Sequence, residues 1–495
     1  MVAACGSLPE RTPPVETRSL PSAESGTLYR VASEVADGLD TGESAFWLLD
    51  RADFSFEVRL ALADQAVESL DIQHFIWEKD ATSWLFFDRM IQAADRGVRV
   101  RILLDDLTLN SKDGEFAALD KHPNVSVRSF NPWQSRRKLG RAFEFFLKLG
   151  RLNHRMHNKT IIADRHFAIL GGRNIGDRYF GVWEDFVQND LDAMASGPAA
   201  AEVAASFDLY WNSDLSFAVG DVVGRKDAAR ELAPTLEALR SDYLQERDRL
   251  REFPFETASW SELFNYLINS YSPGVGFLAQ DLPDVEASLP DQLYAPLLQM
   301  IARAEERVLI CTAYLVPDEA LFELLADLES RGVEVTILTN SLASNNHKVA
   351  HTGYKPWRRK LLRIGVDLYE ARDDSIHIGE YSVPPIEPAF LGLHSKAIVV
   401  DDRWSFVGSP NIDPRSLLIN TEIGFFVESP ELASRLTALL ERDISPDAAW
   451  RVYEDERGRM RWESSAGTLK NQPALGFMQR VATFFINLLP LKSQA

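Results

Sequence analysis

The chain has 495 residues, of which 45% are hydrophobic and 25% are charged, and this ordinary composition excludes a disordered, fibrous or small disulfide-stapled protein. Its 73 acidic residues outnumber its 53 basic ones, and the formal net charge of −20 disfavours nucleic-acid binding unless basic residues gather in one place. Two cysteines are too few for a disulfide framework or a cysteine zinc site, and no stretch approaches the roughly 20 apolar residues of a membrane-spanning helix.

The amino-terminal residues predict a flexible tail over residues 1–26. Residues 1–6 are similar to the cleavage end of a bacterial lipoprotein signal, and the Pro-, Ser-, Thr- and Glu-rich residues that follow are typical of a tether. Two interpretations stay open. Either the true start lies upstream and Cys5 carries a lipid anchor, or the similarity arose by chance on a mobile tail.

An internal repeat organises the remainder of the chain. The sequence Arg-Gly-Val-Arg-Val-Arg-Ile-Leu at 96–103 recurs at 331–338 as Arg-Gly-Val-Glu-Val-Thr-Ile-Leu. Each copy follows an amphipathic stretch typical of a helix, and each of these stretches follows an apolar run rich in β-favouring residues. The elements predicted in this way are strands at 70–77, 125–130, 308–315 and 366–369, and helices at 83–95 and 319–330.

Strands that alternate with helices imply right-handed βαβ crossovers. The predicted fold class is therefore α/β, with two halves related by a pseudo-twofold axis, each a mixed, largely parallel sheet flanked by helices. Residues 477–489 are apolar but too few to span a bilayer, so they predict a helix that lies in the headgroup layer or docks on the protein. The predicted boundaries are a first half over 27–213, a helical connector over 214–290, a second half over 291–450 and a C-terminal segment over 451–495.

Each half contains the same set of chemically active residues at the same spacing. One His-x-Lys alone is common by chance, but its duplication with identical gaps indicates a functional site. The first half has His157, Lys159, Asp164, Gly171, Gly172 and Asn174, and the second has His394, Lys396, Asp401, Gly408, Ser409 and Asn411.

Residues two apart on a strand share a face, so each histidine and its lysine are expected to point the same way. Asp164 and Asp401 have the opposite parity, and we predict that they are structural and hold the following turn. The glycine-containing pairs permit a tight turn that places Asn174 and Asn411 beside the lysines.

Two such sets that face each other would grip one phosphodiester from both sides. One imidazole attacks phosphorus while the other donates a proton to the departing alcohol, and the product is a phosphohistidine that a second alcohol or water releases. A nucleophilic imidazole needs a fixed tautomer, commonly secured by a carboxylate on its other nitrogen. Aligning 196–198 with 428–430 places Asp190 opposite Glu422, and these acids are the predicted partners.

No metal and no cofactor are predicted. His154 and His157 are three residues apart at the expected start of a strand, with no clustered acids, and do not make a convincing zinc site.

The double pattern resembles the phospholipase D superfamily, the HKD enzymes, and within it the bacterial cardiolipin synthases, particularly the C-type branch. The segments that carry the resemblance are 71–77 with Asp80, 155–159, 171–177, 351–354, 411–416 and 420–422. The resemblance implies two phospholipase D-like halves, a single active site between them, a covalent phosphatidyl-histidine and no metal. By analogy, His157 is the nucleophile and His394 the acid.

One position departs from the superfamily pattern. Gly172 stands where serine is common, and little loss is expected because a backbone amide remains there.

Basic residues interleaved with aromatic ones lie near both motifs. The segment 136–159 holds eight cations and one acid, and 341–365 holds cations and no acid. Such segments suit an interfacial helix that binds anionic headgroups, and an ordinary amphipathic helix packed on the core is the alternative.

The resulting prediction is a membrane-associated phosphatidyltransferase of the bacterial cell envelope that makes cardiolipin. Its expected partners are phospholipids (phosphatidylglycerol, and phosphatidylethanolamine as another candidate) and the membrane surface. A hydrolytic phospholipase D is the first alternative, and a nuclease of the superfamily is disfavoured because a nuclease accounts for the cations but not for the phenylalanines. The phosphatidyl donor, an accessory protein, the oligomeric state and the side of the membrane stay open.

Overall fold

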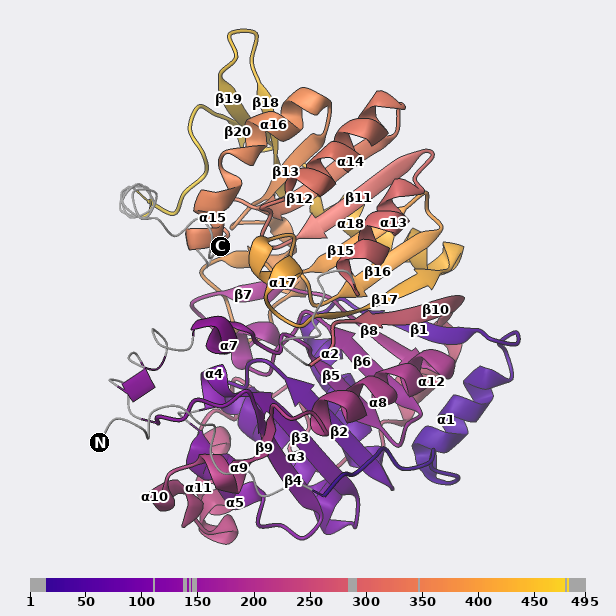
Figure 1. Ribbon diagram of the computed structural model, residues 1–495, viewed down its shortest axis with the longest axis vertical. Helices are drawn as coiled ribbons and strands as arrows, with labels where there is room; N and C mark the ends of the chain where they lie inside the picture. The colour runs from indigo at the N-terminus through magenta and orange to yellow at the C-terminus, as the bar shows by residue number, and fades with distance from the viewer. Residues whose placement is uncertain are drawn as a thin grey trace.

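The computed structural model describes residues 15–109, 112–136, 140, 141, 144, 149–283, 292–345, 348–476 and 479. Figure 1 shows two α/β halves stacked along the long axis, the first in indigo to magenta and the second in orange to yellow. The fold class predicted from the sequence is confirmed.

Matching local signals start and stop the equivalent helices of the two halves. Asp80 accepts a hydrogen bond from the backbone N of Ser83 at the start of α3, and Asp318 does the same for Leu321 at the start of α14. Gly97 and Gly332 follow these helices with φ of 101° and 83°, a region that glycine enters without steric cost. The repeated Arg-Gly-Val is thus a helix end that leads into a strand.

The first half is a sheet with helices on its faces. Its elements are α1 (Gly26–Ala36), β1 (Ser44–Leu49), α2 (Ala52–Gln65), β2 (Ser69–His74), α3 (Ala81–Asp95), β3 (Arg99–Asp105), α4 (Asp106–Leu109), α5 (Asp113–Leu119), β4 (Val125–Phe130), α7 (Leu149–Asn153), β5 (Thr160–Ala163), β6 (Phe167–Gly171), η1 (Asp177–Tyr179), β7 (Val187–Asn189), β8 (Asp192–Ser196), α8 (Pro198–Trp211) and β9 (Ser216–Ala218).

Four helices follow: α9 (Val219–Val222), α10 (Arg225–Ala228), α11 (Leu232–Gln245) and α12 (Ser261–Ser270). The remaining elements are β10 (Ser272–Gln280), α13 (Tyr294–Ala302), β11 (Arg307–Thr312), α14 (Glu319–Ser330), β12 (Glu334–Asn340), α15 (Lys348–Tyr354), α16 (Trp357–Ile364), β13 (Asp367–Ala371), η2 (Ile376–Glu380), β14 (Leu391–Leu393), β15 (Lys396–Val400), β16 (Trp404–Gly408), α17 (Pro414–Leu418), β17 (Ile423–Glu428), α18 (Pro430–Asp443), β18 (Ala449–Glu454), β19 (Met460–Ser464) and β20 (Gly467–Leu469).

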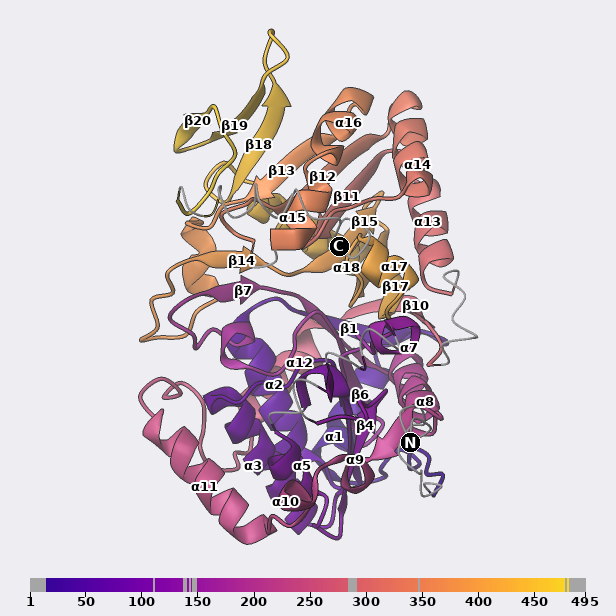
Figure 2. The same cartoon turned by 60° about the vertical axis from the view of Figure 1, so that its left-hand side comes forward.

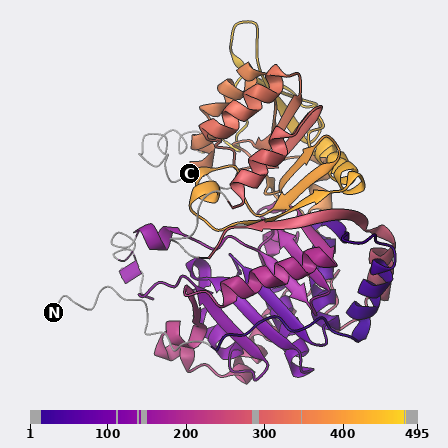
Figure 3. The ribbon, with the colours of Figure 1, turned by 45° about the vertical axis from the view of Figure 1, so that its right-hand side comes forward.

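The two halves share one continuous sheet whose strand order is symmetric about its middle. From one edge the order is β9-β4-β3-β2-β5-β6-β8-β1, and it continues as β10-β17-β16-β15-β11-β12-β13-β18-β19-β20. The antiparallel pair β1–β10, with Ser44 opposite Gly274, forms the seam between the halves (Figure 3). Each strand up to β9 therefore has a counterpart at the same distance from the seam.

Parallel pairing is less extensive than the sequence predicted. It covers β2–β3–β4, the equivalent β11–β12–β13, and the separate pair β7–β14. The other strand pairs named above are antiparallel, and among those that involve β5, β6, β8 and their counterparts only β5–β6 and β15–β16 are joined by a short turn. The sheet is mixed, with antiparallel pairs in the majority.

The predicted connector contains sheet strands at both of its ends. β9 pairs with β4 of the first half, and β10 pairs with both β1 and β17, so that β10 is the counterpart of β1 rather than a linker. Both strands were missed in the sequence because the residues between them are polar and typical of helices. Similarly, β18 to β20 continue the second sheet into the predicted C-terminal segment.

The described part of the predicted N-terminal tail lies against the fold. Ser19 donates its backbone N–H to Asp208 on α8 at 2.7 Å, and Arg101 donates to the carbonyl of Thr17 at 3.0 Å. Ala23 is 3% exposed and accepts a hydrogen bond from His166. Residues 15–25 are therefore an ordered strap, while Cys5 lies outside the described residues.

Candidate active site

Both motif histidines lie where a short segment of one half pairs with a short segment of the other. The backbone N of His157 donates to the carbonyl of Thr421 at 2.9 Å, beside a bridge between Met156 and Thr421. The backbone N of His394 donates to the carbonyl of Asn189 at 2.7 Å, directly after the parallel pair β7–β14 (Figure 2). His157 therefore lies beside the residue that follows Thr421, and His394 lies beside the residue that follows Asn189.

That residue is the predicted acid, and each acid serves the histidine of the opposite half. Nδ1 of His157 lies 2.8 Å from Oε2 of Glu422, and Nδ1 of His394 lies 2.5 Å from Oδ2 of Asp190. With Nδ1 bound to a carboxylate, Nε2 is the nitrogen left to meet a substrate. The sequence had singled out both acids, but not that they are exchanged between the halves.

The middle residue of each His-x-Lys motif reinforces this exchange. Asn158 accepts a hydrogen bond from the hydroxyl of Thr421 at 2.9 Å, and the hydroxyl of Ser395 donates to Asn189 at 3.0 Å. Thr421 and Asn189 directly precede the two acids. Each acid and the residue before it are thus both hydrogen-bonded to the His-x-Lys motif of the opposite half, which fixes the position of the carboxylate.

Burial makes both imidazoles reluctant to take a proton. Their side chains are 10% and 9% exposed. Desolvation lowers the pKa of His157 to about 4 and that of His394 to about 4, although the nearby carboxylate acts in the opposite direction in each case. Both rings are therefore neutral in the free protein at neutral pH.

The two lysines lie with the histidines in the same buried region. Each ammonium group donates to the carbonyl of its own motif histidine. Burial lowers the pKa of Lys159 to about 7, and the charge of Lys396 contributes to that shift. The two ammonium groups are therefore close enough to repel each other, a strain that an anionic ligand between them would relieve.

The two asparagines are held differently. Asn174 accepts a hydrogen bond from the backbone N of Ile76 at 3.0 Å and donates its amide to the hydroxyl of Tyr179, also at 3.0 Å. Oδ1 of Asn411 is buried and has no hydrogen-bond partner among the described residues. Oδ1 of Asn411 is therefore an unused acceptor, whereas both amide atoms of Asn174 bind neighbouring protein groups.

The Gly172–Ser409 difference follows from the lengths of the two acids. A Cβ on Gly172 would lie 2.0 Å from Oδ1 of Asp190, so no side chain fits there. The longer Glu422 leaves space for Ser409, whose hydroxyl donates to Oε2 of Glu422. The backbone N–H that remains at Gly172 donates to the carbonyl of Leu191 at 3.1 Å.

Asp164 and Asp401 hold backbone turns. Asp164 accepts hydrogen bonds from the backbone N–H groups of 67–69, and Asp401 accepts from those of 305–307. Both residues adopt φ of 51°. The turns that they hold lead into β2 and β11, rather than being the turns that follow the aspartates in sequence.

Three further residues lie at the site. The sequence pattern had assigned a role to none of them, although Phe75 lies in the segment 71–77 that carries the family resemblance. Phe75 contacts the ring of His157 edge to face, with centroids 4.9 Å apart, and Tyr179 contacts His394 in the same way at 5.8 Å. Asp281, after β10, accepts the backbone N–H of Glu422 at 2.9 Å, and burial raises its pKa to about 7. A single phenylalanine, tyrosine or aspartate has no motif of its own.

The basic segments are not free cationic patches where they are described. Most of their described arginines pair with acids, and except for Glu144 these acids come from outside the two segments. The pairs are Arg136 with Asp106, Arg151 with Glu144, Arg155 with Asp105, Arg358 with Glu370, Arg359 and Arg363 with Glu454, and Lys360 with Glu319. Residues 137–139, 142, 143, 145–148 and most of the predicted helix at 477–489 lie outside the described residues.

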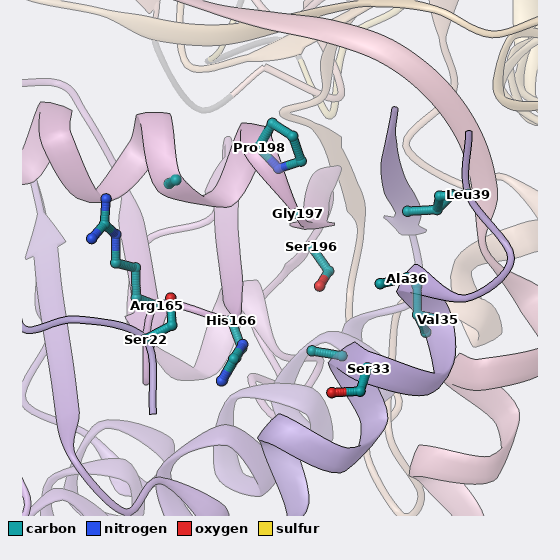
Figure 4. Close-up of a pocket in the computed structure, with 12 residues that line it drawn as sticks. Ser22, Ser33, Val35, Ala36, Leu39, Arg165, His166, Ser196, Gly197 and Pro198 are labelled. Atoms are coloured by element: carbon teal, nitrogen blue, oxygen red, sulfur yellow. The ribbon is translucent and has the colours of Figure 1, made fainter. Parts of the chain in front are cut away.

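A pocket of about 470 Å³ lies apart from these histidines. Figure 4 shows it between α1, the turn that carries Arg165 and His166, and the start of α8 at Pro198. None of the predicted site residues lines it. In the described part of the chain, no helix combines the length and apolar character needed to cross a bilayer.

Comparisons with known proteins agree with this geometry. A family model described as "Cardiolipin synthase, PLD-like domain" matches residues 60–211 and 297–444. The chain is 35% identical over 470 residues to cardiolipin synthase C of Escherichia coli (strain K12), covering 91% of this chain and 96% of that protein. It is 33% identical over 447 residues to an uncharacterized protein of Helicobacter pylori (strain J99), covering 87% and 86%.

Among solved structures, the fold is similar to that of phosphatidylserine synthase from Haemophilus influenzae Rd KW20, with a TM-score of 0.55 at 15% identity, covering 83% of this chain and 91% of that one. The family match covers both halves and the sequence match nearly the whole chain. The chain therefore belongs to the cardiolipin synthase family with phospholipase D-like domains, as a phosphatidyltransferase of the phospholipase D superfamily.

Proposed function

We propose that the protein transfers a phosphatidyl group through a phosphohistidine intermediate to the headgroup of phosphatidylglycerol and so forms cardiolipin. The observation that carries this proposal is the exchange of carboxylates, which gives each imidazole a fixed Nδ1 and directs its Nε2 toward a substrate. The relative named cardiolipin synthase C supports the choice of product.

In the first step, Nε2 of His157 attacks phosphorus and forms an N–P bond while the bond from phosphorus to the leaving alcohol breaks. His394 gives a proton to that alcohol. Glu422 accepts the Nδ1 hydrogen of His157 and stabilises the positive charge that develops on the ring. The intermediate is a phosphatidyl-histidine.

In the second step, His394 takes the proton of the incoming headgroup hydroxyl. The oxygen forms a new bond to phosphorus, the N–P bond breaks, and His157 returns to its neutral form. Lys159 and Lys396 hold the phosphate oxygens, the amide nitrogen of Asn411 is a further donor to them, and Asn174 is in a supporting position.

The pKa values of the free site fit this sequence of events. His157 is neutral at working pH because its pKa is about 4, so it is ready to attack. His394 must gain a proton to act as an acid, and the negative charge of a bound phosphodiester raises the pKa of a neighbouring imidazole. Substrate binding therefore supplies the acid form.

Limited access of water favours transfer over hydrolysis. Both histidines are less than a tenth exposed, and an aromatic ring lies against each of them. Water is a competing acceptor for the phosphohistidine, so its exclusion is needed for an alcohol to be used instead.

We also propose that the protein acts at a membrane surface. Leu418, which ends α17, is 58% exposed, and Arg415 of the same helix binds Asn153 close to His157. An exposed apolar side chain beside the site suits insertion into a lipid layer. The predicted interfacial helix at 477–489 and the envelope location are further parts of this proposal.

The test is product analysis with defined lipids. Purified protein is incubated with vesicles in which phosphatidylglycerol and phosphatidylethanolamine carry different acyl chains, and products are identified by mass spectrometry. Cardiolipin supports the proposal, and its acyl composition identifies the donor. Phosphatidic acid as the sole product contradicts transfer, and cleavage of oligonucleotides without lipid turnover contradicts the substrate class.

A further inference from the structure

The environments of the two histidines differ in one chemical respect, although the halves are built alike. The aromatic ring against His157 is the hydrocarbon Phe75, whereas the ring against His394 is the phenol Tyr179. Both rings come from the first half. At the equivalent positions, 313 and 416, the second half has Ala313 and Ser416. A hydroxyl-bearing ring therefore stands beside one histidine of the pair.

The hydroxyl of Tyr179 is held in a fixed position. It accepts a hydrogen bond from the amide of Asn174 at 3.0 Å, and Asn174 is itself fixed by the backbone N of Ile76. The guanidinium of Arg178 lies 5.2 Å from the centre of the tyrosine ring and is anchored to Glu78. Tyr179 is 2% exposed, so this orientation is maintained by packing as well.

The hydrogen of this hydroxyl remains available. Asn174 supplies a donor, so the tyrosine oxygen acts as the acceptor in that bond. Among the described residues, none is recorded as accepting the hydrogen of Tyr179. Burial raises the pKa of Tyr179, which keeps the hydroxyl protonated under working conditions. A buried donor without an acceptor is costly unless a ligand completes it.

We propose that Tyr179 donates a hydrogen bond to the oxygen of the acceptor alcohol beside His394, and so favours transfer to an alcohol over hydrolysis of the phosphohistidine at His157. This inference rests on the proposed phosphatidyl transfer. The incoming hydroxyl gives its proton to Nε2 of His394, its oxygen bonds to phosphorus as the N–P bond to His157 breaks, and Tyr179 keeps its own proton throughout. The alcohol side of the site is then the side of His394.

The experiment separates the two chemical steps. A phosphatidyl ester of p-nitrophenol is used as donor, because p-nitrophenolate leaves without needing a proton, and its release reports formation of the phosphohistidine. Glycerol at increasing concentration is the acceptor. The ratio of phosphatidylglycerol to phosphatidic acid then reports the competition between alcohol and water.

Tyr179→Phe keeps the ring and removes the hydroxyl. We expect the burst of p-nitrophenolate to stay within about twofold of the unchanged protein, while the ratio of transfer to hydrolysis falls about tenfold, the loss expected for one hydrogen bond to a reacting group. The matched control is Tyr243→Phe, which removes the hydroxyl of a buried tyrosine on α11 that binds Asp88. It should leave both readings unchanged.

Two outcomes would overturn the inference. An unchanged product ratio in Tyr179→Phe would show that the hydroxyl does not act on the acceptor, and loss of the burst would show that Tyr179 serves the whole site rather than the alcohol step. Failure of the proposed function is seen separately, because it appears in the unchanged protein as the absence of cardiolipin from natural lipids.

Discussion

Ser409 donates its hydroxyl hydrogen to the carboxylate oxygen of Glu422 that also binds His157. The other oxygen, Oε1, is buried and has no partner among the described residues. The hydroxyl of Ser409 therefore helps to fix the orientation of the Glu422 carboxylate. In the proposed mechanism, the orientation of the nucleophilic histidine depends on Ser409 through Glu422.

Ser409→Ala should lower kcat by about tenfold, because a hydrogen bond to a charged group contributes about 1.5 to 3 kcal/mol. The strand β16, which ends directly before Ser409, offers a matched control in Ser405, whose buried hydroxyl has no partner among the described residues. Ser405→Ala should leave kcat unchanged. Steady-state rates on phosphatidylglycerol vesicles measure both, and equal losses in the two variants would contradict the role given to Ser409.

Removing the charge of either exchanged acid should nearly abolish turnover. For Glu422→Gln or Asp190→Asn we expect a loss of about a thousandfold or more, because the imidazole loses its fixed tautomer and the stabilisation of its positive form. Glu428→Gln, at a largely solvent-accessible pair with Arg403, is the control. Turnover near the unchanged level in the acid variants, with normal far-UV circular dichroism, would refute the proposed mechanism.

A side chain at position 172 should displace the acid that holds His394. In Gly172→Ala the new Cβ would meet Asp190 at 2.0 Å, displace the carboxylate from His394 and reduce kcat by about a hundredfold. Gly220→Ala is the control, because a Cβ there meets no atom within 4 Å. If Gly172→Ala kept its activity, the close approach to Asp190 would have no functional meaning.

The pH dependence of kcat/KM should show a plateau between two limits. Below about pH 4, His157 is protonated and cannot attack, so activity falls as the pH decreases. Above about pH 7, Lys159 loses its proton and with it a phosphate-binding charge, so activity falls as the pH increases. Thermal unfolding recorded over the same range separates titration from loss of structure. An acid limit near pH 6.5, the ordinary value for histidine, would contradict the effect of burial.

Asp401 should matter for stability and not for chemistry. Asp401→Asn keeps a residue that tolerates the left-handed backbone, but it removes one acceptor for the N–H groups of 305–307. We expect the free energy of unfolding to fall by about 1 to 2 kcal/mol, with kcat per folded molecule within about twofold. A large loss of kcat without loss of stability would make Asp401 catalytic instead.

The sequence was informative wherever a pattern repeated. The duplicated His-x-Lys spacing identified the family, and helix 319–330 and strand 125–130 were predicted with the bounds that the structure has. β10 was missed because a single strand among polar helices has no repeated partner nearby. Its counterpart β1 lies far away in sequence, and the match is visible only through pairing in the sheet.

The site residues divide in the same way. Asp190 and Glu422 were found because an alignment of the two halves placed them opposite each other. Their exchange was not found, because the pairing of 189 with 394 and of 421 with 157 is a property of how the halves dock. The ion pairs of the basic segments were missed for a similar reason, because Glu370 and Glu454 lie on strands outside those segments.

The sequence separation of 265 between His157 and Glu422 also has a consequence for how activity arises during synthesis. A chain emerging from the ribosome can complete the first half, including Lys159 and Asn174, long before Glu422 is made. Until then its imidazole has no carboxylate to fix it. In the proposed mechanism, attack on phospholipid therefore waits until the second half has been translated and has folded against the first.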